Sequence, residues 1–382
     1  MNLKRIIIIL ILGLFFSFLF LLPRVLAQAD FVSESTPSSG FQSQEEILET
    51  KVQKILEERQ EKPMGAEEFQ LYQKLELLVT KGSLKGKTIM IESGSLLMSN
   101  LPKYKVGDGL VVSYSKDFEG NDLFLITDYL RRNSLFWLFV IFLVIALLVG
   151  RWQGATSLIG LGISFLVIFK FILPQIYGGA NPVQIAIFGS LIIIPVTFCL
   201  SHGLNKKTGI AIAGTAITLI LTGILASLFI NLSQLTGFAS EEAGFLQAYK
   251  PGLINIRGLL LAGIIIGVLG ILDDITISQA AIVDQLKKTN PKLKSTELYK
   301  KAMSVGRDHI ASMINTLILI YVGAALPLLL LFIDNPHPFT EVINYEIIAD
   351  EVVRTLVGSI GLILAVPITT SIAVLVADKS RS

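Results

Sequence analysis

Long apolar stretches separated by short polar ones fill the chain from about residue 134 onward. These stretches carry almost no charge, and about 20 apolar residues make a helix long enough to cross a bilayer. The stretches cover residues 135–150, 155–173, 183–200, 209–230, 258–272, 310–333 and 355–377. The pattern therefore predicts an α-helical polytopic membrane domain with about seven transmembrane helices over residues 134–382.

The N-terminus carries a separate apolar run. Residues 6–22 contain no charge, follow Lys4 and Arg5, and precede an Ala-Gln-Ala sequence at residues 27–29. A basic start, an apolar core and small residues at a cleavage site predict a secretory signal peptide over residues 1–29. The alternative is an uncleaved anchor helix, because a run of 17 apolar residues almost spans a bilayer. Both interpretations place the following residues on the outer, extracytoplasmic side of the membrane.

Residues 30–71 are polar and predict a linker followed by an amphipathic helix. Residues 30–44 are rich in Ser, Pro and Gly, which is typical of a linker. In the next segment the apolar positions recur at helical spacing, and they are Leu48, Val52, Ile55 and Leu56. That spacing predicts a helix with one apolar face over residues 44–62.

From Tyr72 the apolar period changes to two. Leu75, Leu77 and Val79 alternate with polar residues, and turns containing Gly separate further short runs of this kind. Alternation with such turns predicts about four strands, and hence a small exported β-rich domain over residues 72–133, either a barrel or a sandwich. This stretch has no histidine and no clustered nucleophile and base. We therefore expect a binding or spacer module there rather than an enzyme.

Lysines and arginines gather on alternate connections between the apolar stretches. With the β-rich domain outside, residues 151–154, 201–208 and 273–309 and the C-terminal tail face the cytoplasm and hold twelve Lys and Arg, against three outside. Positive residues favour the cytoplasmic side. We expect a multi-pass cell-membrane protein with an extracytoplasmic N-terminal domain and a cytoplasmic C-terminus. The basic residues at 287–307 are then a topology signal first, and a lipid or partner site second.

Composition narrows the functional classes. Only 16% of residues are charged, whereas soluble proteins have about a quarter. The net charge of +2 argues against nucleic-acid binding, and the single Cys199 excludes an internal disulfide. The sequence has no phosphate-binding loop, dinucleotide fingerprint, HExxH or Gly-x-Ser-x-Gly motif. We therefore expect no enzyme, no cofactor, and no ATP-driven transport by this chain alone.

Small residues in the apolar stretches predict close helix packing. Gly263 and Gly267 form a GxxxG match, and Gly358 and Gly361 supply further small positions. Prolines inside three apolar stretches remove backbone donors and can kink helices, as they do in many transporters. Each of them is also compatible with a simple bend.

Asp273 and Asp274 are candidate ion-relay residues. They follow the Gly-rich apolar stretch 258–272, and Thr276 and Gln279 continue a run rich in oxygen ligands. Such carboxylates can hold a hard cation or a proton. The alternative is that they mark the exit from the membrane, or cap a following helix over residues 275–288.

Further polar candidates lie in or beside other apolar stretches. Lys170 has apolar residues on both sides, and its alternative role is to extend its ammonium to the membrane interface. Arg307, Asp308 and His309 precede the sixth stretch, and Asn315 lies within it. His309 could join the aspartates in a relay or be an ordinary boundary residue. Near Asp350 and Glu351, Arg354 fits an exposed ion pair that contributes little. No metal ligand set is identified.

Several motifs in combination resemble the YibE/F-like family of bacterial membrane proteins. They cover residues 151–154, 179–182, 270–279, 305–310, 315–317, 323–327, Arg354 and 365–370. The resemblance extends over essentially the whole chain after the N-terminal apolar run. It implies a polytopic membrane protein, and implies no particular activity or set of catalytic residues.

These patterns lead to one main hypothesis, a permease-like protein that moves a small solute or ion through Gly- and Pro-containing helices. The alternative is a scaffold or sensor that links the exported domain to cytoplasmic partners through residues 273–309. The expected partners are the lipid bilayer, a small solute or ion, and a protein partner or second copy of the chain. Nucleic acid is not among them.

Overall fold

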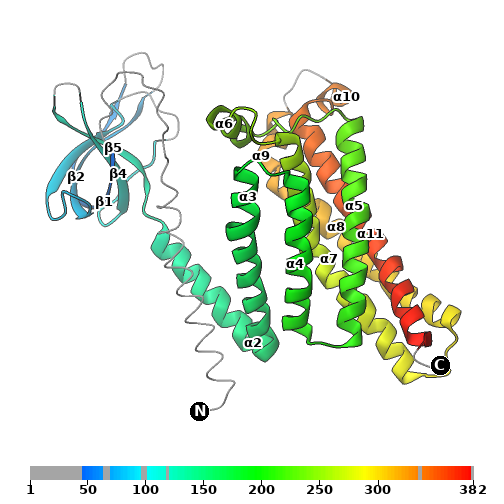
Figure 1. Ribbon diagram of the computed structural model, residues 1–382. Helices are drawn as coiled ribbons and strands as arrows, with labels where there is room; N and C mark the ends of the chain where they lie inside the picture. Colours follow the sequence, from blue (N-terminus) through cyan, green and yellow to red (C-terminus); the bar gives the residue numbers. More distant parts are fainter. Residues whose placement is uncertain (1–44, 63–68, 96–100, 118–119, 334–337, 380–382) are drawn as a thin grey trace, which may run out of the picture. The chain divides into compact units, whose positions relative to one another are not determined.

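The computed structural model describes residues 45–62, 69–95, 101–117, 120–333 and 338–379 (Figure 1). The predicted signal peptide and linker, residues 1–44, lie outside this description. The described chain divides at residues 145/146 into two compact units. Each unit is described by itself.

The first unit contains one antiparallel sheet with the strand order β3-β2-β1-β4-β5. Its strands are β1 (Glu46–Glu61), β2 (Gln70–Lys81), β3 (Thr88–Ser93), β4 (Gly109–Lys116) and β5 (Asp122–Tyr129). The last four strands match the period-two pattern from Tyr72 onward. The predicted β-rich fold is therefore confirmed, as a single curved sheet rather than a sandwich.

The sheet encloses a small apolar core on one face. Leu48, Leu75, Leu77, Leu110 and Val112 are each 0% exposed. They come from β1, β2 and β4, the three central strands of the sheet. Alternation of buried and exposed positions along β2 is what a half-buried strand requires.

The predicted amphipathic helix over residues 44–62 is wrong, because this segment is the central strand β1. It pairs with β2 on one side and β4 on the other, so its backbone groups bond to both neighbours. The register against β2 shifts between Val52 and Lys54 and again between Ile55 and Glu57. Such bulges insert extra residues and break the period of two. Because of the bulges near Val52 and Ile55, the apolar residues of this strand have the spacing that is typical of a helix.

Glu49 on β1 forms ion pairs with Arg132 and Lys81. The guanidinium of Arg132 donates to its two carboxylate oxygens over 2.9 and 2.6 Å, and Lys81 also donates to it. Burial raises the pKa of the Glu49 carboxyl, but the hydrogen bonds and charges of Arg132 and Lys81 outweigh this and hold the pKa below its usual range. Glu49 is therefore ionised at neutral pH and pairs with the first residue of the first long helix.

Helices form nearly all of the second unit. The segments from Arg132 onward are α2 (Arg132–Val167), η1 (Ile168–Ile172), α3 (Leu173–Tyr177), α4 (Pro182–His202), α5 (Lys206–Leu232), α6 (Glu241–Tyr249), α7 (Ile256–Thr289), α8 (Ser295–Ala324), α9 (Leu326–Leu331), α10 (Phe339–Val342) and α11 (Glu346–Lys379). The segment η1 is a single π-helical turn.

Five of the described helices are long and apolar enough to cross a membrane. One of them, Arg132–Tyr177, has a break at Arg151, where φ is 51° and ψ is −130°. That break falls at the connection expected between the first and second apolar stretches. The sixth stretch, 310–333, is divided between α8 and α9 by a turn at Ala325, ahead of Pro327. The helices thus establish a membrane-protein architecture, and a total of seven crossings stays a prediction.

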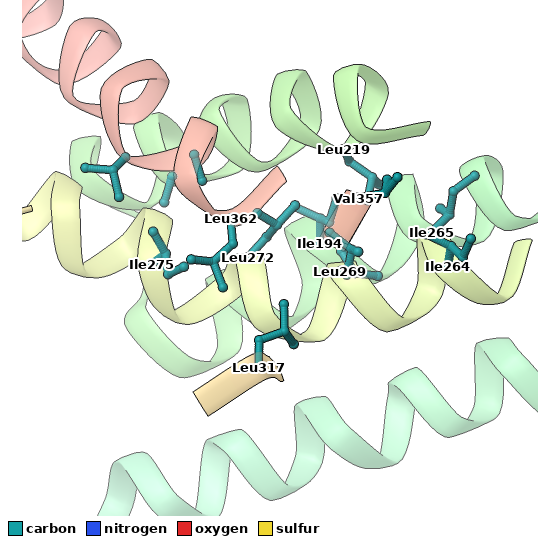
Figure 2. Packing of buried hydrophobic residues seen from close by; sticks show 14 of the residues in the cluster. Ile194, Leu219, Ile264, Ile265, Leu269, Leu272, Ile275, Leu317, Val357 and Leu362 are labelled. Carbon is teal, nitrogen blue, oxygen red and sulfur yellow. The ribbon is translucent and has the colours of Figure 1, made fainter. Parts of the chain in front are cut away.

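Helix α7 is the centre of the bundle and packs against α4, α5, α8 and α11. Figure 2 shows Ile264, Ile265 and Leu272 of α7 among apolar side chains of its neighbours. In contrast, large apolar side chains such as Trp137, Leu138 and Ile224 are more than half exposed. In a membrane helix, such an outward apolar surface is suited to contact with lipid.

Close helix approach depends on different glycines from those of the GxxxG match. A Cβ on Gly361 of α11 would lie 2.3 Å from Thr222 Oγ1 of α5, and one on Gly214 of α5 would lie 2.4 Å from Thr369 Oγ1 of α11. A Cβ on Gly263 would meet nothing within 4 Å, and one on Gly267 would make ordinary contact with Tyr321. Of these four glycines, the two in tight contact therefore lie between α5 and α11.

Candidate functional site

Asp273 lies in the interior of α7, the eighteenth of its 34 residues. Leu272 and Ile275, which flank the Asp273-Asp274 pair in the sequence, are 0% and 2% exposed and belong to the bundle core (Figure 2). Asp273 is half-buried, and its Oδ1 is fully buried with no hydrogen-bond partner among the described residues. A carboxylate oxygen in this state is costly unless a proton or cation accompanies it.

The alternative in which the two aspartates cap a new helix is wrong. Helix α7 continues without interruption from Ile256 to Thr289, and its N-cap is Asn255, whose side chain accepts from Gly258 N. No Gly or Pro follows Asp273 until Pro291, so nothing in the sequence breaks the helix there. The apolar stretch ends at residue 272, but the helix does not.

Asp274 is placed differently from its neighbour. Successive helix residues point about 100° apart, and Asp274 is exposed whereas Asp273 is half-buried. Asp274 lies in electrostatic range of His202 at the end of α4. The structure therefore separates the two aspartates, and only Asp273 faces the bundle interior.

A buried polar seam continues from Asp273 along α7. Thr276 donates to Leu272 O over 2.9 Å, and its Oγ1 lies 2.8 Å from Thr215 Oγ1 of α5. One turn further, Gln279 Nε2 donates to Thr370 Oγ1 of α11 over 2.8 Å and to Ala302 O of α8 over 3.0 Å. Hydrogen bonds thus link α7 to α5, α8 and α11 inside the bundle.

Helix α5 presents four buried threonines to this seam. Thr208, Thr215, Thr218 and Thr222 recur at helical spacing and are each 0–1% exposed. Thr218 and Thr222 donate to carbonyls of their own helix, at Gly214 and Thr218. This row was not among the predicted site residues, although its spacing along one helix face was a signal in the sequence.

Across from α5, Thr369 on α11 is 0% exposed and its Oγ1 has no hydrogen-bond partner among the described residues. Three motif stretches that are distant in sequence meet at this place. Gln279 from residues 270–279 bonds Thr370 from residues 365–370, and both stretches pack on Gly306. The α7, α8 and α11 sides of the seam therefore contain residues that carried the family resemblance, whereas the threonines of α5 lie outside those stretches.

A second acidic group lies at the start of α11. Asp350 is 7% exposed, and its Oδ1 is buried without a hydrogen-bond partner in the described chain. Arg354 Nε lies 4.0 Å from Glu351, and both side chains are 34% exposed. The prediction of an exposed pair at Arg354 therefore needs correction, because these side chains are partly buried. Asp350 was not among the predicted site residues.

The other predicted residues do not join Asp273. Lys170 is exposed on η1, which packs against α4. Arg307, Asp308 and Asn315 are exposed on α8, and His309 is half-buried. Within the described residues no hydrogen bond or ion pair connects any of these side chains to the aspartates, and no cluster of three His, Cys, Asp or Glu could hold a metal ion.

Comparison with known proteins gives one match. A family model described as YibE/F-like protein matches residues 138–379, which is more than half of the chain. No curated protein matches the chain, and no solved structure does.

Proposed function

The chain belongs to the YibE/F-like protein family, and we propose that this membrane protein is a permease that moves a small cation, or a small solute coupled to one. Asp273 is the residue that holds the cation or proton. The threonines of α5, α7 and α11 supply hydroxyl oxygens beside it.

The observation that supports this proposal most strongly is the unpartnered Asp273 Oδ1 in the interior of α7. Ionisable groups at membrane depth are costly, and in membrane proteins they mark ion and proton paths. Hydroxyl and carboxylate oxygens are the ligands that small hard cations prefer. Thr276 of α7 provides such an oxygen, and so do Thr215 of α5 and Thr369 of α11, two helices that pack against α7.

One observation favours a non-transporting scaffold or sensor instead. Several buried threonines, including Thr218, Thr222 and Thr370, donate to carbonyls of their own helices. A hydroxyl that already donates to a carbonyl of its own helix needs no solute as a hydrogen-bond partner. Threonine is also small enough to allow helices to pack closely. The two functions differ in one property, which is whether water reaches the seam during the working cycle.

Thiol labelling tests water access to the seam. In a Cys199→Ser background, Thr215→Cys is expected to react with a small charged methanethiosulfonate reagent, because alternating access must open the seam to water. The matched control Ile224→Cys lies on the 61% exposed outer face of α5 and should stay unmodified in lipid. Thr296→Cys, exposed in the first turn of α8, serves as the positive control. Mass spectrometry reads each modification. Labelling of Thr296→Cys alone would favour the scaffold.

A further inference from the structure

A groove with a volume of about 650 Å³ lies at one end of the bundle, away from Asp273. It is formed by the start of α5, the last third of α7 and the last turns of α11. Its lining residues are Asn205, Lys206, Lys207, Ile210, Ala280, Val283, Asp284, Lys287, Lys288, Pro291, Ala373, Val376 and Ala377.

The groove has an apolar wall and a cationic rim. Ile210, Val283 and Val376 represent the wall, with one residue from each of the three helices. The rim holds four lysines and a single carboxylate, Asp284. The lining thus presents a clear excess of positive charge directly beside an apolar surface.

The ion pairs inside the groove leave most of this charge uncompensated. Lys288 Nζ lies 2.8 Å from Asp284, and Lys207 Nζ lies 4.0 Å from the same carboxylate. Lys287 Nζ donates to Leu293 O over 2.9 Å, which fixes its position without neutralising its charge. Lys206 is exposed and has no ion pair among the described residues. An anionic group is therefore the natural complement of the rim.

The location of the groove indicates what carries that anion. It lies where α4 connects to α5 and where α11 ends, and α4, α5, α7 and α11 are all candidate membrane spans. The lysines then stand at headgroup level, with the apolar wall directed toward the acyl region. The bias of Lys and Arg predicts that this end faces the cytoplasm. Anionic lipids are concentrated in that leaflet and bind basic pockets between helices.

We propose that this groove binds an anionic phospholipid, with the phosphate between Lys206, Lys207, Lys287 and Lys288 and an acyl chain along Ile210, Val283 and Val376. A free phosphate would use the lysines but would gain nothing from the apolar wall. A neutral lipid would use the wall but would leave the rim unpaired. The site does not depend on whether the protein transports a solute.

Native mass spectrometry of the purified full chain tests the site with added phosphatidylglycerol. The Lys206→Gln/Lys207→Gln variant is expected to bind this lipid roughly 30-fold more weakly, on the basis of typical lysine contributions at an anionic surface. The matched control Lys300→Gln/Lys301→Gln removes two exposed lysines of α8 that lie outside the groove, and should retain binding. Lys206→Arg/Lys207→Arg should also retain binding, which separates loss of charge from loss of fold.

Phosphatidylcholine and inorganic phosphate are the comparison ligands. We expect phosphatidylcholine to bind the wild type much more weakly than phosphatidylglycerol, and millimolar phosphate to leave phosphatidylglycerol bound. Equal binding of the two lipids would overturn the proposal. Equal loss in the groove variant and the α8 control would also overturn it, and so would displacement of the lipid by phosphate.

Discussion

Replacing Asp273 with Asn is expected to abolish activity while leaving the protein folded. The amide has almost the same shape but can neither take up a proton nor hold a cation by its charge. Asp273 Oδ1 is buried without a partner among the described residues, so Asn removes a group that is costly to bury. We expect the variant to fail to complement a deletion strain, with normal abundance by immunoblot and a thermal midpoint in detergent no lower than that of the wild type.

Asp274→Asn is the matched control for this result. It makes the same chemical change one residue further along α7, at an exposed position. We expect it to complement the deletion. Full complementation by Asp273→Asn would refute the role of Asp273 as the cation-binding residue. Loss of complementation in both variants would mean that the exposed carboxylate of Asp274 is as important for activity as the half-buried carboxylate of Asp273.

Gly361→Ala is expected to destabilise the bundle by about 1–3 kcal/mol, the usual range for overpacking a well-packed interior. Its new Cβ would lie 2.3 Å from Thr222 Oγ1 and 3.2 Å from Thr222 Cβ, so α5 and α11 would have to separate. Thermal unfolding in detergent measures the change. Because Thr222 supplies the clashing atoms, the same substitution in a Thr222→Ala background should cost clearly less.

Gly263→Ala on α7 is the control for this prediction. Gly263 is part of the GxxxG match, but a Cβ there meets nothing within 4 Å. We expect no loss of stability, because Ala also favours a helix more than Gly does. If Gly263→Ala proved the more harmful of the two, the predicted clash between a Cβ at Gly361 and Thr222 would be contradicted.

Apolar periodicity predicted the class of the protein but not every element. The period of two from Tyr72 onward identified four strands, because that part of the sheet alternates regularly between core and solvent. The strand β1 was predicted as a helix, because register shifts at Val52 and Ile55 give its apolar residues the spacing of a helix. Which strand lies at the centre of a sheet depends on long-range pairing, and short-range spacing carries no information about that.

The candidate site was predictable only in part. Asp273 was identified because a carboxylate beside an apolar stretch is unusual, but hydropathy placed the end of the helix at residue 272. The continuous α7 instead holds Asp273 in its interior. Thr369 and Asp350 were not predicted as buried polar residues, because Thr is unremarkable in apolar helices and an acidic residue at a helix start is common. Their burial results from helix packing, which the sequence does not display.

Cation flux in proteoliposomes tests the central claim most directly. Purified wild type, Asp273→Asn and Asp274→Asn are reconstituted at equal amounts, and dissipation of proton, sodium and potassium gradients is followed with trapped fluorescent indicators. We predict that the wild type and Asp274→Asn dissipate at least one of these gradients faster than protein-free liposomes, and that Asp273→Asn does not. Wild-type protein that matches protein-free liposomes for all three cations would contradict cation transport by this protein.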